Sequence, residues 1–504
     1  MTSALVSRSE LGVWRRVRRY DVPPAMIAAA TAARLAGDWR AACTAAGIEV
    51  RGPAEDFAEF ADDLAHLAPD LVRWHLPRSP ARGDTTPEPR QLIVLARRGD
   101  RMLAVATPRV GLAVSRMALF AGEGPADEEY FHGEYDWSAS RERWDAREAG
   151  ELIRRTCGPR AAEVLALQDA GRIDEAWATA GVDVPMPPTG ERFPESTLRP
   201  NAAALDADPD RLLAAARATG RTEASIPLGY YYYELRLRDL DTDRPRGEWL
   251  RTDRRAEPGV AIGALLRPVD LHLVRLGLLS PADLHPLIGP LLEPFAAPVP
   301  PRRPDADPAP VRVRCGGRWH EVGWAAGRLH IPHDDEERRR EDALRALGGE
   351  LHGCFAAAAG WRDRSVPLPR RLEAQRTDLM MRAVHGDLAG VVALLDAGVD
   401  PHARDPHGRT LLHLLPCFAH DPGGALALLD RLLAAGLDLE DRDRRGRTPL
   451  HTAVHGDGSP DLVRALLAAG ALVTAEDNVF DSIADAYTRH RRDDLPFLDE
   501  LLPG

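Results

Sequence analysis

The stretch "GRTPLHTAVHGDGSPDLVRALLAAGALVTAED" (Gly446–Asp477) predicts two consecutive helices. Thr448 is placed to cap the first helix, because a hydroxyl before a helix can accept a hydrogen bond from a free backbone N–H. Pro449 suits the first turn, where no N–H is needed, and His451 can hydrogen-bond back toward the turn. The stretch therefore predicts a short helix that begins at a defined residue.

The second half of the stretch predicts a helix with one apolar face. Leu462, Leu466 and Leu467 fall on one side at helical spacing, and Gly470 suits the left-handed conformation that ends a helix. The three leucines of the second helix and Leu450 of the first helix form an apolar seam. A single pair of helices cannot bury such a seam alone, so a neighbouring unit is expected.

The neighbouring units are visible as repeats in the same register. "GRTLLHLL" begins at Gly408 and "GRTPLHTA" at Gly446, 38 residues later. The "LL-x-A-G" segments recur at intervals of 38 and 34 residues, and they begin at Leu394, Leu432 and Leu466. The same two intervals separate Asp405, Asp443 and Asp477. Three markers that share one register indicate a repeat array.

These units resemble the ankyrin repeat, which has a period of about 33 residues and a T-P-L-H-x-A opening. The resemblance covers roughly the last quarter of the chain, in three to four units. The last unit has Phe480 in place of glycine and "DSIADA" in place of the motif, as expected of a terminal cap. The extra residues of the middle unit, in "PCFAHDPGGALALLDR", predict a lengthened loop between its helices at Pro416 and Gly423-Gly424. The structural motif positions are Thr410, His413, Thr448, Pro449, His451, Gly398, Gly436 and Gly470.

The resemblance implies recognition of another protein by the turn tips and the first helices. The tip residues that we expect to contact a partner are His402, Arg404, His407, Asp441, Arg442, Arg444, Arg445, Glu476 and Asn478. They carry mixed charge and no apolar patch. This composition predicts a polar contact of modest affinity, and tips that are merely solvated are the open alternative.

Composition limits the possible partners and the compartment. The 504 residues carry a formal net charge of -12, and all 65 basic residues are arginine, which disfavours a nucleic-acid or anionic-membrane binder. The basic cluster Trp14–Arg19 is interpreted as a solvated helix face. The five cysteines form no C-x-x-C pair, so neither a disulfide framework nor a structural zinc site is expected, and the prediction is a cytoplasmic protein. They are Cys43, Cys157, Cys315, Cys354 and Cys417.

The rest of the chain predicts an α+β protein, mainly helical with β-hairpins before the C-terminal ankyrin α-solenoid. The predicted divisions are a region of unknown function at 1–292, a Pro-rich linker at 293–310, a three-strand meander plus helix at 311–369 and the repeats at 370–504. A hairpin is expected around Arg97–Arg101, and a strand at Gly229–Arg238. "AGDWRAACTAAGIEV" (Ala36–Val50) and "AGRIDEAWATAGVDV" (Ala170–Val184) share glycines ten residues apart. Either an ancient duplication or the similarity of Ala-rich helices explains the two copies.

A search for catalytic motifs gives no assignment. The common nucleotide-binding, zinc-protease and hydrolase motifs are absent. The cluster "HIPHDDEE", with His330 and His333, has no regular metal-ligand spacing, so no metal and no cofactor are predicted. The segment with His132 and Glu134 is interpreted as a charged, aromatic-bearing loop or helix start, and Cys354 as a buried structural residue.

Two functional hypotheses remain from the sequence. The first is a protein-binding module or scaffold that acts through the repeats, with an unidentified protein partner and neither nucleic acid nor membrane. The second is an enzyme or toxin-like effector whose N-terminal active site is targeted by the repeats. The whole chain resembles uncharacterised ankyrin-containing proteins of high-GC Gram-positive bacteria, a resemblance that implies no reaction. The oligomeric state stays open.

Overall fold

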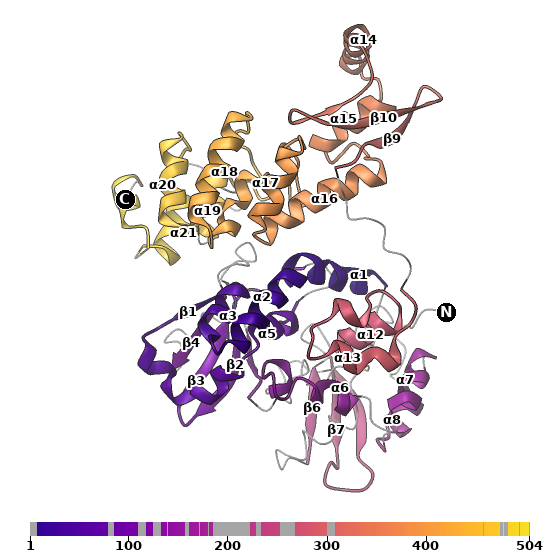
Figure 1. Ribbon diagram of the computed structural model, residues 1–504, viewed down its shortest axis with the longest axis vertical. Coiled ribbons are helices and arrows are strands. Elements are labelled where there is room, and N and C mark those ends of the chain that lie inside the picture. The colour runs from indigo at the N-terminus through magenta and orange to yellow at the C-terminus, as the bar shows by residue number, and fades with distance from the viewer. Residues whose placement is uncertain are drawn as a thin grey trace. The chain divides into compact units, whose positions relative to one another are not determined.

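The computed structural model divides the chain into two compact units (Figure 1). Unit one comprises Met1–Thr107 and Ala118–Pro301, and unit two comprises Pro108–Met117 and Arg302–Gly504. The structure describes residues 8–78, 85–108, 117–123, 133–138, 140–156, 161–170, 172–179, 181–184, 222–227, 233–251, 268–299, 308–456, 458–473, 477, 482–492 and 494–502. Among these residues, no helix has both the length and the apolar character needed to cross a bilayer.

Unit one is rich in short helices. Among the described residues its α-helices are α1 Arg8–Arg16, α2 Pro24–Leu35, α3 Trp39–Ala45, α4 Ala61–Ala65, α5 Pro69–His75, α6 Glu151–Thr156, α7 Ala161–Asp169, α8 Ile173–Thr179, α12 Val269–Arg275 and α13 Gly289–Leu292. One π-helical turn, η1 Val17–Asp21, and the 3-10 turns η2 Ala54–Phe60, η6 Arg141–Arg143, η8 Pro281–Asp283 and η9 Glu293–Phe295 connect them. The predicted α+β class is confirmed.

Two sheets complete unit one. The five-stranded sheet has the order β1-β4-β3-β2-β5 and the three-stranded sheet the order β6-β7-β8. The strands are β1 Ile48–Arg51, β2 Gln91–Arg98, β3 Arg101–Ala106, β4 Met117–Gly122, β5 Gly133–Asp136, β6 Ala224–Pro227, β7 Tyr233–Arg238 and β8 Arg246–Arg251. The predicted hairpin is present as the antiparallel pair β2–β3, which turns at Gly99 with φ 56°. Strand β7 forms the end of the predicted Gly229–Arg238 strand, and residues 229–232 lie outside the described part.

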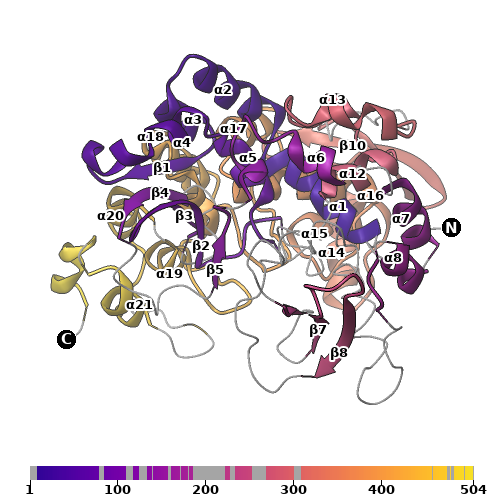
Figure 2. The ribbon, with the colours of Figure 1, turned by 90° about the horizontal axis from the view of Figure 1, so that it is seen from below.

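The two similar segments of unit one share their local structure. In the first, α2 and α3 precede β1, which lies at the edge of its sheet beside β4 (Figures 1 and 2). In the second, α7 and α8 precede Asp183, which pairs with Arg246 of β8. Gly47 and Gly181, at matching positions, both have positive φ, 67° and 87°. The shared order of two helices and an edge segment favours the duplication hypothesis.

The basic cluster near the start is only in part the solvated helix face that the sequence predicts, because Arg15 is exposed but Arg18 is buried. Arg18 is only 3% exposed. Its guanidinium lies 4.0 Å from the centre of the Trp74 ring and its Nη2 lies 3.9 Å from Asp270 Oδ1. The Trp74 indole N–H donates to the other oxygen of Asp270 at 2.9 Å. The sequence prediction failed for Arg18 because these partners are distant in the chain, and the pairing makes burial of the charge tolerable.

The first residues of the predicted linker pack on unit one. Glu293–Phe295 forms η9, and Phe295 lies against the core that includes Leu273 and Val274. The Ala297 N–H donates to Val274 O at 3.1 Å. Residues 300–307 lie outside the described part, so the described portion of the predicted linker is partly anchored.

Unit two begins with a three-stranded antiparallel sheet, as the meander prediction requires. Its strands are β9 Val311–Cys315, β10 Arg318–Ala325 and β11 Arg328–His330, and two helices follow, α14 Asp335–Ala346 and α15 Gly353–Arg362. The small core between sheet and helices contains Val311, Val313, Val322, Ile331, Cys354, Ala357 and Leu372. A core of this size gives limited stabilisation by itself.

The repeat array follows as two layers of helices (Figure 1). Its helices are α16 Arg370–Val384, α17 Leu388–Asp396, α18 Pro422–Ala434, α19 Pro449–His455, α20 Pro460–Ala468 and α21 Ile483–His490, with the 3-10 turns η10 Leu412–Phe418 and η11 Pro496–Glu500. One layer stacks α16, η10, α19 and α21 in sequence, and the other stacks α17, α18 and α20. The predicted seam forms, since Leu450, Leu462 and Leu466 are buried in one continuous core and Leu467 packs partly buried against it.

The middle unit differs from its prediction. The expected lengthened loop is wrong, because Gly423 and Gly424 lie in the first turn of α18. The extra residues lengthen that helix to 13 residues, against 9 each in α17 and α20. Pro416 lies inside η10, where it has no N–H to donate and would clash with a preceding carbonyl in an α-helix. Proline thus accounts for the 3-10 form of this segment.

The sheet of unit two covers the first end of the array. Trp324 of β10 and Trp361 of α15 pack against each other with their ring centres 4.3 Å apart and their planes tilted by 59°, and both contact the array core. The Trp361 indole N–H donates to Asp400 O at 3.0 Å. The Gly327 N–H donates to Gly398 O at 3.1 Å. The array therefore packs against the meander that precedes it.

Candidate partner-binding surface

The turn tips of the array are built on two aspartates, of which Asp405 is buried and Asp443 half-buried. Asp405 and Asp443 occupy equivalent positions, and the N–H of each donates to the carbonyl four residues later, Arg409 O and Arg447 O, both at 3.0 Å. Asp405 Oδ1 accepts the N–H groups of His407 and Arg409 at 2.8 and 2.9 Å. Asp443 Oδ1 accepts two equivalent N–H groups at 2.8 and 2.9 Å. Each carboxylate therefore fixes the conformation of its tip by accepting hydrogen bonds from N–H groups of the same turn.

Neighbouring tips contact each other directly. The Arg444 N–H donates to His407 O at 2.8 Å, so the two turns share a backbone hydrogen bond. Arg404 Nη2 donates to Asp441 Oδ1 at 2.7 Å, across the same boundary. Gly408 permits this approach, because a Cβ there would lie 3.2 Å from Arg444 N. The tips consequently form a continuous ridge.

The predicted tip residues separate into two groups. His402, Arg404 and Asp441 are half-buried and bonded within the protein, and His402 Nδ1 lies 2.8 Å from Asp400 Oδ1. The exposed group consists of His407, Arg442, Arg444 and Arg445, which we call the tip patch. Arg442 is also bonded within its turn, since its Nη1 donates to Gly446 O at 2.9 Å. Glu476 and Asn478 lie outside the described residues.

The tip patch contains arginines and no acidic residue, because the half-buried Asp441 is not part of it and Glu476 lies outside the described residues. The acidic side chains at the tips bond inward: Asp405 pairs with Arg409 at 2.6 Å, and the buried Asp477 pairs with Arg447 at 3.2 Å. Asp441 pairs with Arg404 at 2.7 Å. These three carboxylates are thus paired with arginines, whereas the half-buried Asp443 accepts only backbone N–H groups in the bonds described above, and arginines occupy the exposed ends of the tips.

The structural motif residues take the predicted positions with one difference. Thr448 caps α19 by accepting the His451 N–H at 3.3 Å, and Pro449 is in the first turn. The three motif glycines end helices with positive φ, which is 86° at Gly398, 86° at Gly436 and 102° at Gly470. In the middle unit, however, the Thr410 N–H donates to the His413 ring at 3.1 Å. The 3-10 form of η10 accounts for the changed cap.

His413 ties two repeats together. Its Nδ1 accepts the Thr410 N–H at 3.1 Å, and its Nε2 lies 2.9 Å from Arg447 O in the next unit. A carbonyl oxygen can only accept, so Nε2 carries the hydrogen and Nδ1 is unprotonated. Burial lowers the pKa of His413, although the carbonyl of Arg447 and the nearby Asp443 act in the opposite direction. The ring is therefore a neutral link in the array.

The segment that raised the enzyme hypothesis is only partly described. His132 lies outside the described residues, as does the side chain of Glu134. Asp136, at the end of β5, is exposed and pairs with Arg97 at 2.9 Å. Its Oδ1 also accepts from Ser138 at 2.6 Å. Asp136 thus belongs to an exposed ion pair, which is ordinary at a protein surface.

Comparison with known proteins identifies the array. A family model described as ankyrin repeats, in three copies, matches residues 379–477. No curated protein matches the chain. The C-terminal array therefore consists of ankyrin repeats, and such repeats are protein-protein interaction modules. The resemblance of the whole chain to bacterial proteins of this kind stays a prediction.

Proposed function

We propose that the protein is an adaptor that binds an acidic segment of another protein through the tip patch. The observation that carries the proposal is the division of charge at the tips. The carboxylates of Asp405, Asp441 and Asp477 pair with arginines of the array, and the arginines of the tip patch are exposed residues. Ankyrin arrays present extended surfaces to partners, so this ridge is in a suitable place for binding.

The charge of the whole chain supports an acidic partner at this one surface. The net charge of -12 repels acidic molecules over most of the protein, whereas the tip patch attracts them. Complementary charges of this kind contribute mainly to orientation and association rate. We place the interaction in the cytoplasm, because the scattered cysteines of the sequence fit a reducing compartment.

The test uses the full-length chain and compares two pairs of arginines in unit two, each pair consecutive in the sequence. Arg444 and Arg445 belong to the tip patch, and Arg339 and Arg340 are exposed on α14. The variants R444Q/R445Q and R339Q/R340Q remove the same charge from each place. Fluorescence anisotropy is measured with a labelled peptide of Glu and Asp, and with the Gln and Asn counterpart of that peptide.

The expected result is binding of the acidic peptide alone, weakened about tenfold by R444Q/R445Q, since each exposed charge contributes up to about 1 kcal/mol. R339Q/R340Q should bind like the unmodified chain, and added salt should weaken binding through screening. Equal losses in the two variants would show non-specific attraction. No binding of the acidic peptide, or binding that R444Q/R445Q leaves unchanged, would refute an acidic partner at the tip patch.

A further inference from the structure

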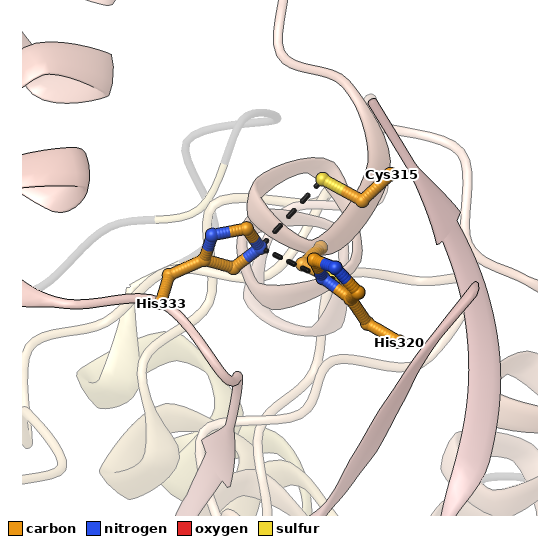
Figure 3. Close-up of side chains that lie close together, drawn as sticks. Cys315, His320 and His333 are labelled. Carbon is orange, nitrogen blue, oxygen red and sulfur yellow. Dashed lines mark hydrogen bonds between the residues drawn. The ribbon is translucent and has the colours of Figure 1, made fainter. Parts of the chain in front are cut away.

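Two cysteines and two histidines from separate elements of unit two converge on one point. Cys315, His320, His333 and Cys354 each offer one ligand atom, and these atoms all lie within 4.8 Å of one another. His333 Nε2 lies 3.2 Å from His320 Nδ1 and 3.6 Å from Cys315 Sγ (Figure 3). Cys354 Sγ lies 3.5 Å from His320 Nδ1.

These separations match the edges of a tetrahedral zinc site. With Zn–N bonds of about 2.0–2.1 Å and Zn–S bonds of about 2.3 Å, a tetrahedron has N···N edges of about 3.3 Å and S···N edges of about 3.6 Å. The observed N···N edge of 3.2 Å and S···N edges of 3.5 and 3.6 Å agree with those values. We propose that Cys315, His320, His333 and Cys354 form a structural zinc site.

The backbone brings the two cysteines together at a position where only glycine fits. Cys315 ends β9, and Cys354 is the second residue of α15. Between them in space lies Gly353, with φ 59°, and a Cβ there would lie 2.6 Å from Cys315 Sγ and 2.9 Å from Cys315 Cα. The start of α15 therefore rests directly on the end of β9.

A carboxylate orients one of the histidines from the far side of the ring. His333 directs Nε2 toward Cys315 and His320, and its Nδ1 lies 3.1 Å from Glu337 Oε2. A carboxylate on the second nitrogen is the usual partner of a metal-bound histidine, because it fixes the tautomer and makes the ligating nitrogen more basic. Glu337 in the first turn of α14 is thus placed to support a ligand.

The donor set and its burial indicate a structural role. Two thiolates and two imidazoles favour zinc over calcium or magnesium, which prefer oxygen. Four protein ligands fill a tetrahedral shell and leave no position for substrate. Cys354 is fully buried, and the side chain of His333 is 8% exposed. Binding releases the two thiol protons to solvent, and two thiolates then cancel the charge of the ion.

The site differs from the histidine cluster that the sequence brought to notice. His330 is exposed on β11, and His333 turns toward three residues outside "HIPHDDEE". The acidic residues that follow begin α14, as the sequence interpretation holds. The predicted absence of a metal is accordingly replaced here by our proposal.

Metal content and cobalt spectra of the full-length chain test the proposal. The chain is stripped with a chelator under reducing conditions and titrated with Zn²⁺ or with Co²⁺. We expect one tightly bound zinc, and a cobalt form with the visible bands of tetrahedral geometry and thiolate charge transfer. C354S and H320A should each weaken zinc binding at least tenfold, because each removes a side chain that binds the metal directly. In H320A the thiolate charge-transfer band of any residual cobalt complex should remain.

Two matched variants control for unspecific effects. C417S replaces a buried cysteine in η10, where burial raises the pKa of the thiol to about 12, and H330A replaces the neighbouring exposed histidine. Both should bind zinc like the unmodified chain. Circular dichroism identifies variants that fail to fold, and chelation with zinc re-addition to the unmodified chain needs no variant at all.

Three results would overturn the proposal. One is an unmodified chain that takes up neither zinc nor cobalt after reduction. Another is a loss of zinc affinity in C417S or H330A that is as large as the loss in C354S. The third is a disulfide between Cys315 and Cys354 in protein kept under reducing conditions, since both are free thiols in the structure.

Discussion

At the scale of single residues, His413 couples packing to protonation. The neutral ring fits because Nδ1 accepts from Thr410 and Nε2 donates to Arg447 O. A second proton on Nδ1 would break the bond from the Thr410 N–H and leave only the Thr410 hydroxyl, 2.9 Å away, as its acceptor, in a buried site that disfavours the charged ring. The folded chain therefore resists protonation of this ring more than the unfolded chain does.

The stability of the array should fall as the solution becomes more acidic. Because the pKa of His413 is lowered by folding, the unfolded chain gains its proton first. The free energy of unfolding is then highest above the unfolded pKa of about 6.5 and declines as the pH falls below it, by at most about 1.4 kcal/mol per pH unit for this group. Hydrogen exchange of the amides of η10 and α19 between pH 7 and pH 5 measures the decline.

Two glutamine variants separate His413 from the other histidines. H413Q keeps an N–H donor but does not titrate, so it should lower the stability at pH 7 by about 1 kcal/mol and make the pH dependence shallower. H407Q changes an exposed ring of the tip patch and should keep the original pH dependence. An H413Q chain with an undiminished pH dependence would show that another group is responsible.

Residues with local roles were predictable, and residues with distant partners were not. Thr448 caps the turn that it begins, and Gly470 ends its own helix, so each role is contained in a few neighbouring letters. Arg18 depends on Trp74 and Asp270, which are distant in the chain. The Cys315 to Cys354 cluster likewise combines ligands without regular spacing. Two local signals could have pointed to it: the C-x-x-x-x-H spacing of Cys315 and His320, and His333 in the "HIPHDDEE" cluster.

At the scale of elements, the position of α15 depends on one glycine. The helix begins at Gly353, which contacts Cys315 at the end of β9. Gly316 has nearly the same conformation, φ 56°, but a Cβ there would meet nothing within 4 Å. The two glycines therefore differ in contact and share the backbone strain that alanine would introduce.

Alanine at these two positions should have unequal effects. G316A adds the cost of a left-handed alanine, about 1 kcal/mol, and G353A adds the same cost plus an overlap with Cys315 of about 1–3 kcal/mol. Exchange of the β9 and β10 amides, and zinc content, measure the difference. We expect G353A to lose metal and G316A to retain it. Similar losses in both variants would mean that strain alone, and not the contact with α15, determines the site.

Element types were easier to predict than their lengths. The meander and the helix pairs follow from turn residues and apolar periodicity. The four extra residues of the middle unit were assigned to a loop because Gly423 and Gly424 are unfavourable inside helices. In the structure these two glycines lie in the first turn of α18, where the Asp421 side chain accepts the Gly424 N–H at 2.9 Å. Pro422 also suits this turn, because it has no N–H that would need an acceptor. Capping at the start thus outweighs the low helix propensity.

At the scale of unit two, the ankyrin array is closed by different structures at its two ends. The sheet and α15 cover α16 through Trp324 and Trp361, and Gln375 of α16 accepts the Trp324 indole N–H at 2.8 Å. At the other end, α21 carries a capping box of Ser482 and Asp485 and packs on α19. Each end therefore shields apolar residues that a further repeat would otherwise bury.

Removal of zinc should loosen the array from one end only. In a repeat array each unit is stabilised chiefly by its contacts with the adjacent units. Loss of the ion would therefore lower the local stability of α15 and α16 first, and that of η10 next. After chelation, hydrogen exchange should rise most in α15 and α16 and remain unchanged in α20 and α21. C354S should show the raised exchange before chelation and no further change after it. A uniform rise along all helices, or no rise beside the sheet, would contradict a site that stabilises the array by closing its first end.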